Sequence, residues 1–308
     1  MFATVKRETR HIPVLLNDVL RVIDPQPGQT IVDCTLGLGG HASELLRSIQ
    51  PGGKLIALDF DPANIVLARA KLEQTGGQFS LHHSNFAGID KILAAENIER
   101  VDAILADVGV ASPQIDDPAR GFSYRRPGPL DMRMDPTRGQ PASALLNRMS
   151  EKELATALLE LGDETDAPQI ARLILERRKE SPITTTAQLT AIVCEARDFT
   201  LQRAAGAKLH PAARTFQALR MLVNRELANL QRLLDVAPSL LRPGGVIVII
   251  SFHSGEDRLV KQSFRDARRA GIYDQTGDDP ITASPEEATR NPRSRSAKLR
   301  WARAAINR

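Results

Sequence analysis

The sequence predicts an α/β fold with a mostly parallel sheet and an inserted all-helical domain. Over residues 30–107, short runs that are typical of strands alternate with helical patterns, as in βαβ units with right-handed crossovers. After a long run of purely helical patterns, residues 246–250 are β-branched throughout, as in a central strand that is buried on both faces. A chain of 308 residues can hold both parts, which we expect to divide as 1–115 with 212–308 and 116–211.

The expected elements follow from the period of the apolar residues and from the residues at turns. Strands are expected, in chain order, over 30–34, 54–59, 79–83, 101–107, 246–250 and 298–303, the last at an edge of the sheet. Helices are expected over 14–23, from about 41, from Pro62, over 167–178 and 185–196, and over 211–234 as one longer helix. Ser150 and Glu153 fit a capping box that starts a further helix. Residues 116–140 are rich in Gly, Pro, Asp and Arg without periodicity, and a loop of this length is usually functional or disordered.

The first expected strand leads into a turn that contains Gly37, Gly39 and Gly40. Glycines let the backbone turn tightly and approach a ligand, and such a turn points unpaired N–H groups at a nucleotide or nucleoside. The second strand ends in Asp59, whose carboxylate can accept hydrogen bonds from both hydroxyls of a ribose. Together the turn and the acid indicate an adenosine-type cofactor.

The glycine spacing alone leaves the cofactor open, because Gly37-x-Gly39-x-x-Ala42 also fits the dinucleotide fingerprint of a NAD-linked dehydrogenase. Asp33, four residues before Gly37, would repel a pyrophosphate but could meet a cationic amino group. S-adenosylmethionine carries an adenosine, a sulfonium and an amino-acid tail, and therefore suits Asp33 and Asp59 together. The alternative for Asp33 is that it only caps the turn or the helix.

Two more strands end in residues that could belong to the same site, since ligands bind at the carboxyl ends of parallel strands. Asp107 ends the fourth strand, and we expect it near the cofactor and the target atom unless it is a loop cap. Pro113 is expected to hold Ser112 in an extended conformation with its carbonyl exposed. His253 follows the strand over 246–250 and is either a site residue or a hydrogen-bonded structural histidine.

Arginine-rich segments favour a partner with a phosphate backbone, although each could be a solvated face. The net charge is +4, but six arginines and only two acids lie between 120 and 148, and the basic tail 290–308 has no acid. Aromatic residues beside arginines suit an unpaired nucleotide. The candidate RNA contacts are Phe122, Tyr124, Arg125, Arg126, Arg133 and Arg138. A basic RNA-binding or assembly factor with a vestigial cofactor site is a further alternative.

The two cysteines, Cys34 and Cys194, show neither metal-ligand spacing nor a disulfide framework, so no metal is expected. The sequence has no run of about 20 apolar residues and no recognisable signal peptide. We expect a cytoplasmic protein without a membrane partner.

Several strings make the resemblance to one family specific. The most specific are Gly128-Pro-Leu-Asp-Met-Arg-Met-Asp135 and Thr215-Phe-Gln217. Others are His11-Ile-Pro-Val-Leu15, Gly37-Leu-Gly-Gly-His41, Asp59-Phe-Asp-Pro62, Gly121-Phe-Ser123, His210-Pro-Ala-Ala-Arg214, Ser251-Phe-His-Ser254 and Asn291-Pro-Arg-Ser-Arg-Ser296. Over nearly its whole length the chain resembles the bacterial small-subunit (16S) ribosomal RNA cytosine-N4 methyltransferases of the MraW/RsmH type.

The resemblance implies a class I methyltransferase domain, Rossmann-like and interrupted by a helical domain, that acts on N4 of one cytidine in the decoding region. It implies small-subunit ribosomal RNA as the partner, within an assembled or nearly assembled subunit, and leaves a homodimer open. The residues that would contact S-adenosylmethionine are Gly39, Gly40, His41, Asp59, Phe86, Asp107 and Gln114. For catalysis we expect the Asp107 carboxylate and the Ser112 carbonyl to bind the N4 hydrogens, with His253 as a third candidate. The target base must leave its stack, and Phe122 or Tyr124 could hold it.

Overall fold

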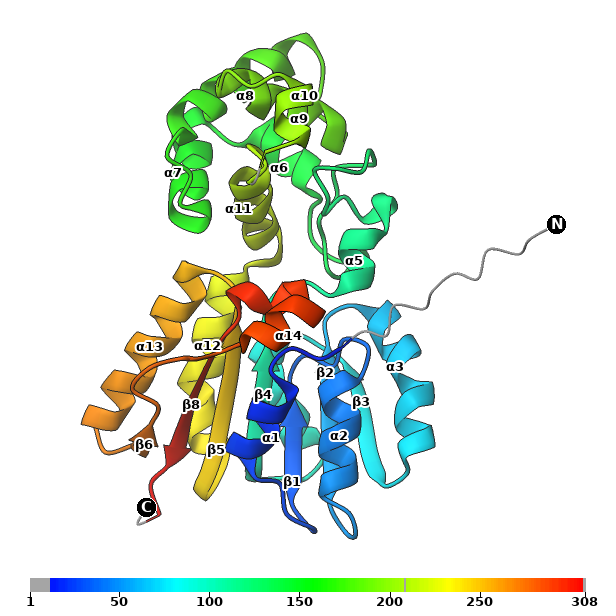
Figure 1. Ribbon diagram of the computed structural model, residues 1–308, viewed down its shortest axis with the longest axis vertical. Coiled ribbons are helices and arrows are strands. Elements are labelled where there is room, and N and C mark those ends of the chain that lie inside the picture. The colour runs from blue at the N-terminus through cyan, green and yellow to red at the C-terminus, as the bar shows by residue number, and fades with distance from the viewer. Residues whose placement is uncertain (1–11, 208, 307–308) are drawn as a thin grey trace, which may run out of the picture. The chain divides into compact units, whose positions relative to one another are not determined.

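The computed structural model describes residues 12–207 and 209–306 (Figure 1). The chain divides into two compact units, one comprising Met1–Gly109 and Asn229–Arg308, the other Val110–Ala228. The two units are described separately below, and the domain limits expected from the sequence remain a prediction.

The first unit is built on one sheet with the strand order β3-β2-β1-β4-β5-β8-β6, and β7 also pairs with β8. The strands are β1 (Thr30–Asp33), β2 (Lys54–Asp59), β3 (Gln78–His83), β4 (Val101–Asp107), β5 (Leu241–Ser251), β6 (Tyr273–Thr276), β7 (Ile281–Thr282) and β8 (Lys298–Ala304). The first five strands are mutually parallel, whereas β8 runs antiparallel to β5, β6 and β7. This confirms the predicted α/β fold with a mostly parallel sheet.

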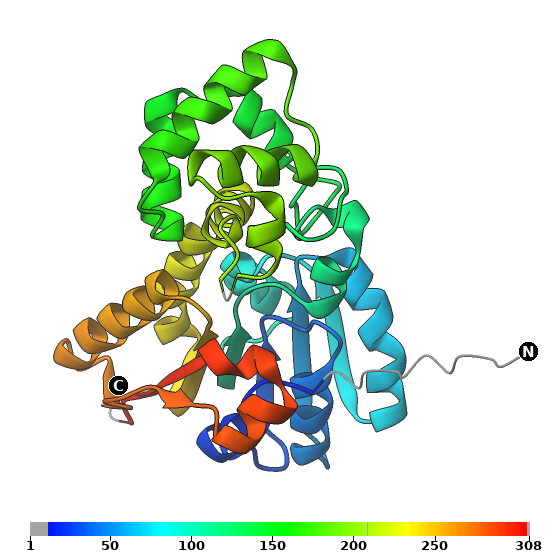
Figure 2. The same cartoon turned by 45° about the horizontal axis from the view of Figure 1, so that its top comes forward.

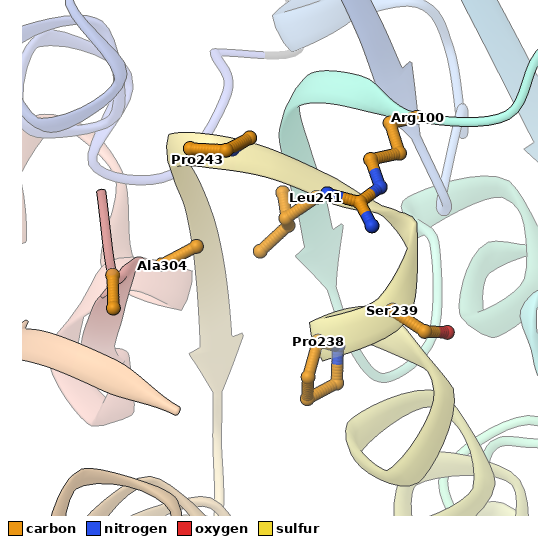
Figure 3. Close-up of a pocket in the computed structure, with 7 residues that line it drawn as sticks. Arg100, Pro238, Ser239, Leu241, Pro243 and Ala304 are labelled. Carbon is orange, nitrogen blue, oxygen red and sulfur yellow. The ribbon is translucent and has the colours of Figure 1, made fainter. Parts of the chain in front are cut away.

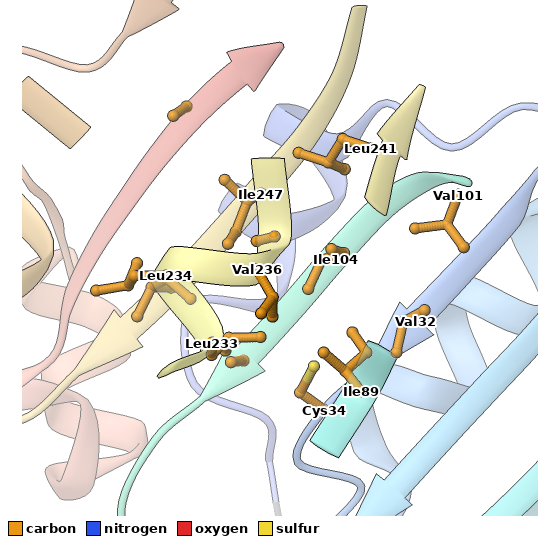
Figure 4. Packing of buried hydrophobic residues seen from close by; sticks show 14 of the residues in the cluster. Val32, Cys34, Ile89, Val101, Ile104, Leu233, Leu234, Val236, Leu241 and Ile247 are labelled. Atoms are coloured by element: carbon orange, nitrogen blue, oxygen red, sulfur yellow. The ribbon is translucent and has the colours of Figure 1, made fainter. Parts of the chain in front are cut away.

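Helices cover both faces of this sheet (Figure 2). Alternate residues of a strand point to opposite faces, so Ile104 packs in one core and Leu105 in the other. On one face lie α1 (Leu16–Ile23), α2 (Gly40–Ser48) and α3 (Pro62–Thr75). On the other lie α4 (Ile89–Ala95), α12 (Glu226–Leu240) and α13 (Ser254–Arg269). Figure 4 shows Ile89 of α4 and Leu233, Leu234 and Val236 of α12 beside apolar side chains of the strands. Shorter elements are η1 (Phe86–Gly88), α14 (Pro285–Arg290) and η3 (Pro292–Ser296).

The second unit is helical and has its own apolar core, in which Leu154, Ile170 and Leu219 are fully buried. Its elements are α5 (Ser112–Asp116), η2 (Pro118–Arg120), α6 (Ala142–Arg148), α7 (Glu151–Gly162), α8 (Ala167–Glu180), α9 (Thr186–Ala196), α10 (Leu201–Ala205) and α11 (Ala213–Asn224). The capping box expected at Ser150 and Glu153 is present at the start of α7. Among the described residues, no helix is both long and apolar enough to cross a membrane.

The prediction of one helix over 211–234 was wrong. The chain breaks between α11 and α12 at Arg225, which has a φ of 53° in the left-handed region. Asn224 stabilises the break, because its side chain accepts a hydrogen bond from the Met134 N–H and donates one to the Met132 carbonyl. Arg220 and Glu226 form a two-bond ion pair across the break, with N–O distances of 2.8 Å.

Two other predictions from the sequence were also wrong. The strand over 298–303 is not at an edge, since β8 lies between β5 and β6. Ser112 is not extended: it is the first residue of α5, and the extended residue is Ala111, with φ −73° and ψ 154°. The Gln114 side chain fixes this start by accepting a hydrogen bond from the Ala111 N–H at 2.9 Å.

Candidate active site

Three acidic side chains end three neighbouring strands of the first unit. Asp59 ends β2, Asp33 ends β1 and Asp107 ends β4, and these strands are adjacent in the order β2-β1-β4. Because the strands are parallel and in register, their carboxyl ends meet at one edge of the sheet. The structure therefore brings together at one edge the acids that the sequence singled out.

The glycine turn between β1 and α2 packs tightly against its neighbours. Gly37 and Gly39 have φ values of 51° and 71°, which favour glycine. A Cβ on Gly39 would lie 3.2 Å from the Cβ of Ala68, and one on Gly40 would lie 2.4 Å from Cγ of Pro13. Close packing is thus one physical reason for Gly39 and Gly40, besides access of a ligand to the backbone.

Asp59 holds the glycine turn in place. Its Oδ2 accepts a hydrogen bond from the Gly37 N–H at 2.7 Å, and its Oδ1 accepts one from the Asp61 N–H at 2.8 Å. The Asn64 amide donates to both oxygens at 3.2 Å. Burial nevertheless raises the pKa of Asp59 to about 6, since these bonds only partly offset desolvation. A carboxylate fixed by so many donors is preorganised to accept further hydrogen bonds with its remaining lone pairs.

Thr35 connects the other two acids, a role that the sequence analysis missed. Its backbone N–H donates to Asp33 Oδ1 at 3.0 Å, and its hydroxyl accepts a hydrogen bond from the Asp107 N–H at 2.7 Å. The backbone and the side chain of Thr35 both tend to lower the pKa of the Asp33 carboxyl. Thr35 thereby ties the end of β1 to the end of β4.

Two carboxyl oxygens at this edge are buried without a hydrogen-bond partner in the described part of the chain, namely Asp33 Oδ2 and Asp107 Oδ1. Burial, with Asp59 nearby, raises the pKa of Asp33 to about 7. Burial, with Asp33 and Glu256 nearby, raises the pKa of Asp107 to about 8. Buried polar atoms are normally paired, so these two oxygens mark a place where a donor or a cation would bind.

His41 and Phe86 also belong to the first unit. The buried His41 ring places Nδ1 3.9 Å from Asp107 Oδ2 and Nε2 2.9 Å from the Val14 carbonyl oxygen. Phe86 lies in η1, which follows β3, and is half-buried against the core. The structure thus brings His41 and Asp107 close to one another.

His253 caps helix α13. Its Nδ1 accepts a hydrogen bond from the Glu256 N–H at 3.3 Å, and its Nε2 lies 3.0 Å from Glu256 Oε1. The same carboxyl accepts a hydrogen bond from the Phe252 N–H at 3.0 Å. His253 therefore has a structural role as the hydrogen-bonded cap of α13, one of the two roles that the sequence left open. Its catalytic role remains a prediction.

The remaining candidates lie in the second unit. Gln114 is buried in α5, Phe122 is buried in the helical core, and Tyr124 stacks on His210 with a centroid distance of 4.5 Å. Arg125 lies over the Tyr124 ring, 5.9 Å from its centroid.

Three of the four predicted RNA-binding arginines form ion pairs within this unit. Arg126 pairs with Asp116 at 3.1 Å, and Arg138 pairs with Asp135 at 3.5 Å. Arg133 binds Asp131 through two hydrogen bonds of 2.8 and 2.7 Å. The flanking acids therefore use part of the positive charge that the sequence offered to a phosphate backbone.

The basic tail is likewise engaged within the first unit. Arg300 is buried and binds Asp257 of α13 at 2.6 Å, while Lys298 binds the same carboxylate at 3.0 Å. Arg303 donates to the Gly244 carbonyl at 3.0 Å. Much of the charge in this segment therefore stabilises the sheet.

A cavity of about 330 Å³ lies at the other end of the strands, between the start of β5 and the ends of α12 and β8 (Figure 3). Pro238, Leu241 and Pro243 line it, and Arg100 is its one charged residue. It has no cluster of titratable groups and lies away from the carboxyl ends, where ligands of parallel sheets bind. The described residues also contain no group of three or more side chains suited to hold a metal. The carboxyl edge is therefore the candidate active site.

The sequence matches the model of the MraW methylase family over residues 8–305. The chain belongs to the MraW methylase family. Three similar proteins are each named "Ribosomal RNA small subunit methyltransferase H". The one from Acidobacterium capsulatum is 44% identical over 300 residues, which cover 95% of this chain and 98% of that protein. Those from Thermomicrobium roseum and Sorangium cellulosum are 43% and 42% identical, covering 96% of this chain and 93% and 91% of those proteins.

Among solved structures, Aeropyrum pernix fibrillarin with natively bound S-adenosyl-L-methionine aligns with a TM-score of 0.39 and 12% identity, over 90% of this chain and 67% of that chain. Membership in a methylase family confirms the predicted fold class, a class I methyltransferase sheet with an all-helical insertion. The chain is thus a methyltransferase, and the NAD-linked dehydrogenase considered from the sequence is set aside.

Proposed function

We propose that this methyltransferase transfers a methyl group from S-adenosylmethionine to the exocyclic N4 of a cytidine in the decoding region of small-subunit (16S) ribosomal RNA. The observation that carries the proposal is the row of acids along one sheet edge, the buried Asp59 and Asp33 and the half-buried Asp107. The names of the relatives, which are ribosomal RNA small subunit methyltransferases, support the substrate class. The resemblance described above supports the N4 position.

The residues at this edge fit S-adenosylmethionine, which when bound supplies an electrophilic methyl group on a positively charged sulfur. Asp33 Oδ2 and Asp107 Oδ1 are buried without a partner in the described chain, and a cationic ligand would offset that cost. Asp59 is held by donors on both oxygens and is placed to bind ribose hydroxyls. We propose that Asp33 and Asp59 bind the two ends of the cofactor, together with the glycine turn, His41 and Phe86. Gln114 stays a candidate from the resemblance.

Asp107 is the residue for which we propose a direct role at the target nitrogen. The N4 lone pair of cytosine is delocalised into the ring, so the amine is a poor nucleophile. A carboxylate that accepts an N4 hydrogen would favour pyramidal geometry and stabilise the charge that develops. A carboxyl whose pKa is raised to about 8 is also a stronger base in its deprotonated form than an ordinary aspartate, and Oδ1 is its unpaired atom in the described part of the chain. Ser112 and His253 remain further candidates from the sequence.

The target base must leave its stack to reach a buried carboxyl, at a cost of a few kcal/mol. Tyr124 is the better candidate to hold it, because Phe122 is buried in the helical core whereas Tyr124 is half-buried and lies beneath Arg125.

The test is transfer of label from methyl-labelled S-adenosylmethionine to small subunits, and separately to naked ribosomal RNA, from a strain that lacks this gene. We expect transfer to at least one of the two substrates, with Asp107→Ala abolishing turnover while RNA affinity stays near wild type. Calorimetry should show binding of S-adenosylmethionine and none of NAD. Absence of transfer to both substrates would instead favour an RNA-binding factor with a vestigial site, and unchanged turnover of Asp107→Ala would reduce Asp107 to a loop cap.

A further inference from the structure

Helix α13 buries two of its three acids and exposes all of its cations. Its acids Glu256 and Asp257 are buried, and both are used inside the fold. Glu256 contacts His253 and the Phe252 N–H, while Asp257 binds Lys298 and Arg300. The cations of the helix are all exposed, and they are Arg258, Lys261, Arg265, Arg268 and Arg269.

At 100° per residue, Arg258, Lys261 and Arg265 fall within about 60° of one another around the helix. Val260 and Phe264, which pack into the core, lie about 60° to 160° away from these cations around the helix. In the described part of the chain these three cations form no ion pair and no side-chain hydrogen bond. We name them the α13 basic face.

The other two cations of the helix have a structural explanation. Arg268 contacts Asp278 at 3.6 Å and Thr276 at 3.1 Å, and Arg269 lies 3.7 Å from Asp266. Both are in the last turn, where positive charge is favoured by the helix dipole. Among the described residues, those of the α13 basic face have no such contacts, and they do not lie in the last turn.

A solvated helix surface usually mixes both signs, with opposite charges at spacings of three and four residues. On α13 the spacing works against stability, because Lys261 and Arg265 are like charges at i and i+4. The only exposed acid of the helix, Asp266, is bound by Gln262 at 2.8 Å and lies beside Arg269. Three unneutralised cations on one ridge therefore have no evident role in the fold.

The position of the ridge relates it to the candidate active site. Helix α13 begins three residues after β5, whose residue Ile250 pairs with Asp107 in the sheet. The helix starts at the carboxyl edge and runs along one flank of the first unit toward β6 (Figure 1). Arg258 to Arg265 extends about 10 Å along the axis, at 1.5 Å per residue.

We propose that the α13 basic face binds the phosphate backbone of the RNA substrate on the flank of the methyltransferase unit. The inference rests on the proposed function for its substrate class and adds a surface that the loop over 116–140 and the basic tail did not include. Closely spaced exposed cations without partners match a chain of phosphates, and each contact made would release condensed counterions.

The test compares two triple variants with equal loss of charge. The first is Arg258→Gln, Lys261→Gln and Arg265→Gln. The matched control is Lys71→Gln, Lys91→Gln and Arg100→Gln, cations of the same unit that also make no ion pair or side-chain hydrogen bond among the described residues. Affinity for naked small-subunit ribosomal RNA and for small subunits is measured from 50 to 300 mM KCl.

We expect the α13 variant to lower the magnitude of the slope of log K against log salt by about 2 to 3, and to weaken binding at least about tenfold at 0.1 M salt. The control should keep the wild-type slope. Affinity for S-adenosylmethionine and turnover at saturating RNA should not change. A variant with Arg258→Lys and Arg265→Lys should retain the slope, because it keeps the charges on the same ridge.

A wild-type slope in the α13 variant, or the same loss in the control, would overturn the proposal. So would weakened binding to small subunits with unchanged binding to naked RNA, which would point to a ribosomal protein as the partner of this face. The proposed function can fail separately. If the wild-type protein transfers no methyl group but the α13 variant still loses RNA affinity, the proposed RNA-binding surface is supported and the proposed function is not.

Discussion

Replacing Asp107 with asparagine is expected to stabilise the cofactor-free protein at neutral and alkaline pH. Burial beside Asp33 and Glu256 raises the pKa of Asp107 from 3.8 to about 8, so the folded state holds the proton more tightly than the unfolded state. The stability linked to this group is therefore full in acid and is lost as the pH rises from about 4 to about 8. Asparagine has no charge to bury and escapes this loss.

The magnitude follows from the pH interval over which the folded protein retains the extra proton. Each pH step of one corresponds to about 1.4 kcal/mol, so the full interval between 3.8 and 7.5 corresponds to about 5 kcal/mol. The Asp107 side chain is 23% exposed, and its raised pKa is shared with Asp33 and Glu256. We therefore expect Asp107→Asn to raise the free energy of unfolding at pH 7.5 by about 1–3 kcal/mol.

The assay is urea unfolding of both proteins between pH 4.5 and 8.5 without cofactor. The stability difference should be near zero at the acid end and should grow with pH. Asp102→Asn is the control, since Asp102 lies at the other end of β4 and accepts hydrogen bonds from the Thr30 N–H and from Arg242, both at 2.7 Å. That substitution should not stabilise the protein at any pH. An Asp107→Asn variant no more stable than wild type at pH 7.5, or a difference independent of pH, would refute the reasoning.

Three further outcomes are expected. Asp59→Ala should weaken binding of S-adenosylmethionine by about 1–3 kcal/mol, because a charged acceptor is lost, and an unchanged dissociation constant in calorimetry would exclude the ribose role. Thr35→Val should lower the free energy of unfolding by about 1–3 kcal/mol, because it leaves the Asp107 N–H unpaired. Thr35→Ser keeps the hydroxyl and should be more stable than Thr35→Val in urea unfolding. Equal stability of the two variants would show that the hydroxyl does not tie the strands. The double variant Arg125→Ala, Arg126→Ala should flatten the salt dependence of RNA binding. Arg133→Ala breaks a two-bond ion pair and should mainly lower the melting temperature. The reverse pattern would assign the phosphate contacts to Arg133.

The carboxyl-edge acids could be predicted from the sequence because each ends an apolar run that is predicted to be a strand. Strand identity and the parallel arrangement then place their side chains at one edge, whatever the details of packing. Asp59 and Asp107 end β2 and β4 at the residues expected, and β1 ends at Asp33, one residue earlier than expected. Their pKa values could not be predicted, since burial and the mutual repulsion of the acids depend on contacts across strands.

Other features depend on contacts between segments distant in the sequence. The role of Thr35 could not be predicted from the sequence, because its hydroxyl accepts a hydrogen bond from the Asp107 N–H, which lies 72 residues away in the chain. The alternation of Lys298, Leu299 and Arg300 is typical of an edge strand. In the structure an interior strand tolerates these charges because Asp257 of α13 binds both of them. In a sequence, a charged residue that is paired with another element of the fold gives the same alternating pattern as a charged residue that is exposed to solvent.

The break between α11 and α12 also had no local signal. Helix ends in the left-handed conformation usually carry glycine, whereas Arg225 occupies the position here. Asn224 compensates through hydrogen bonds to Met132 and Met134, about 90 residues earlier in the chain. The continuous apolar period over 211–234 therefore predicted one helix where tertiary contacts impose two.

The central claim is most directly tested by the identity of the methylated nucleoside. Purified protein is incubated with isotopically labelled S-adenosylmethionine and with small subunits or ribosomal RNA from a strain that lacks this gene. The RNA is then digested and its nucleosides are separated by mass spectrometry against standards. The account predicts label in N4-methylcytidine and its absence with Asp107→Ala. Label in a different nucleoside, or on carbon 5 or the ribose of cytidine, would contradict it.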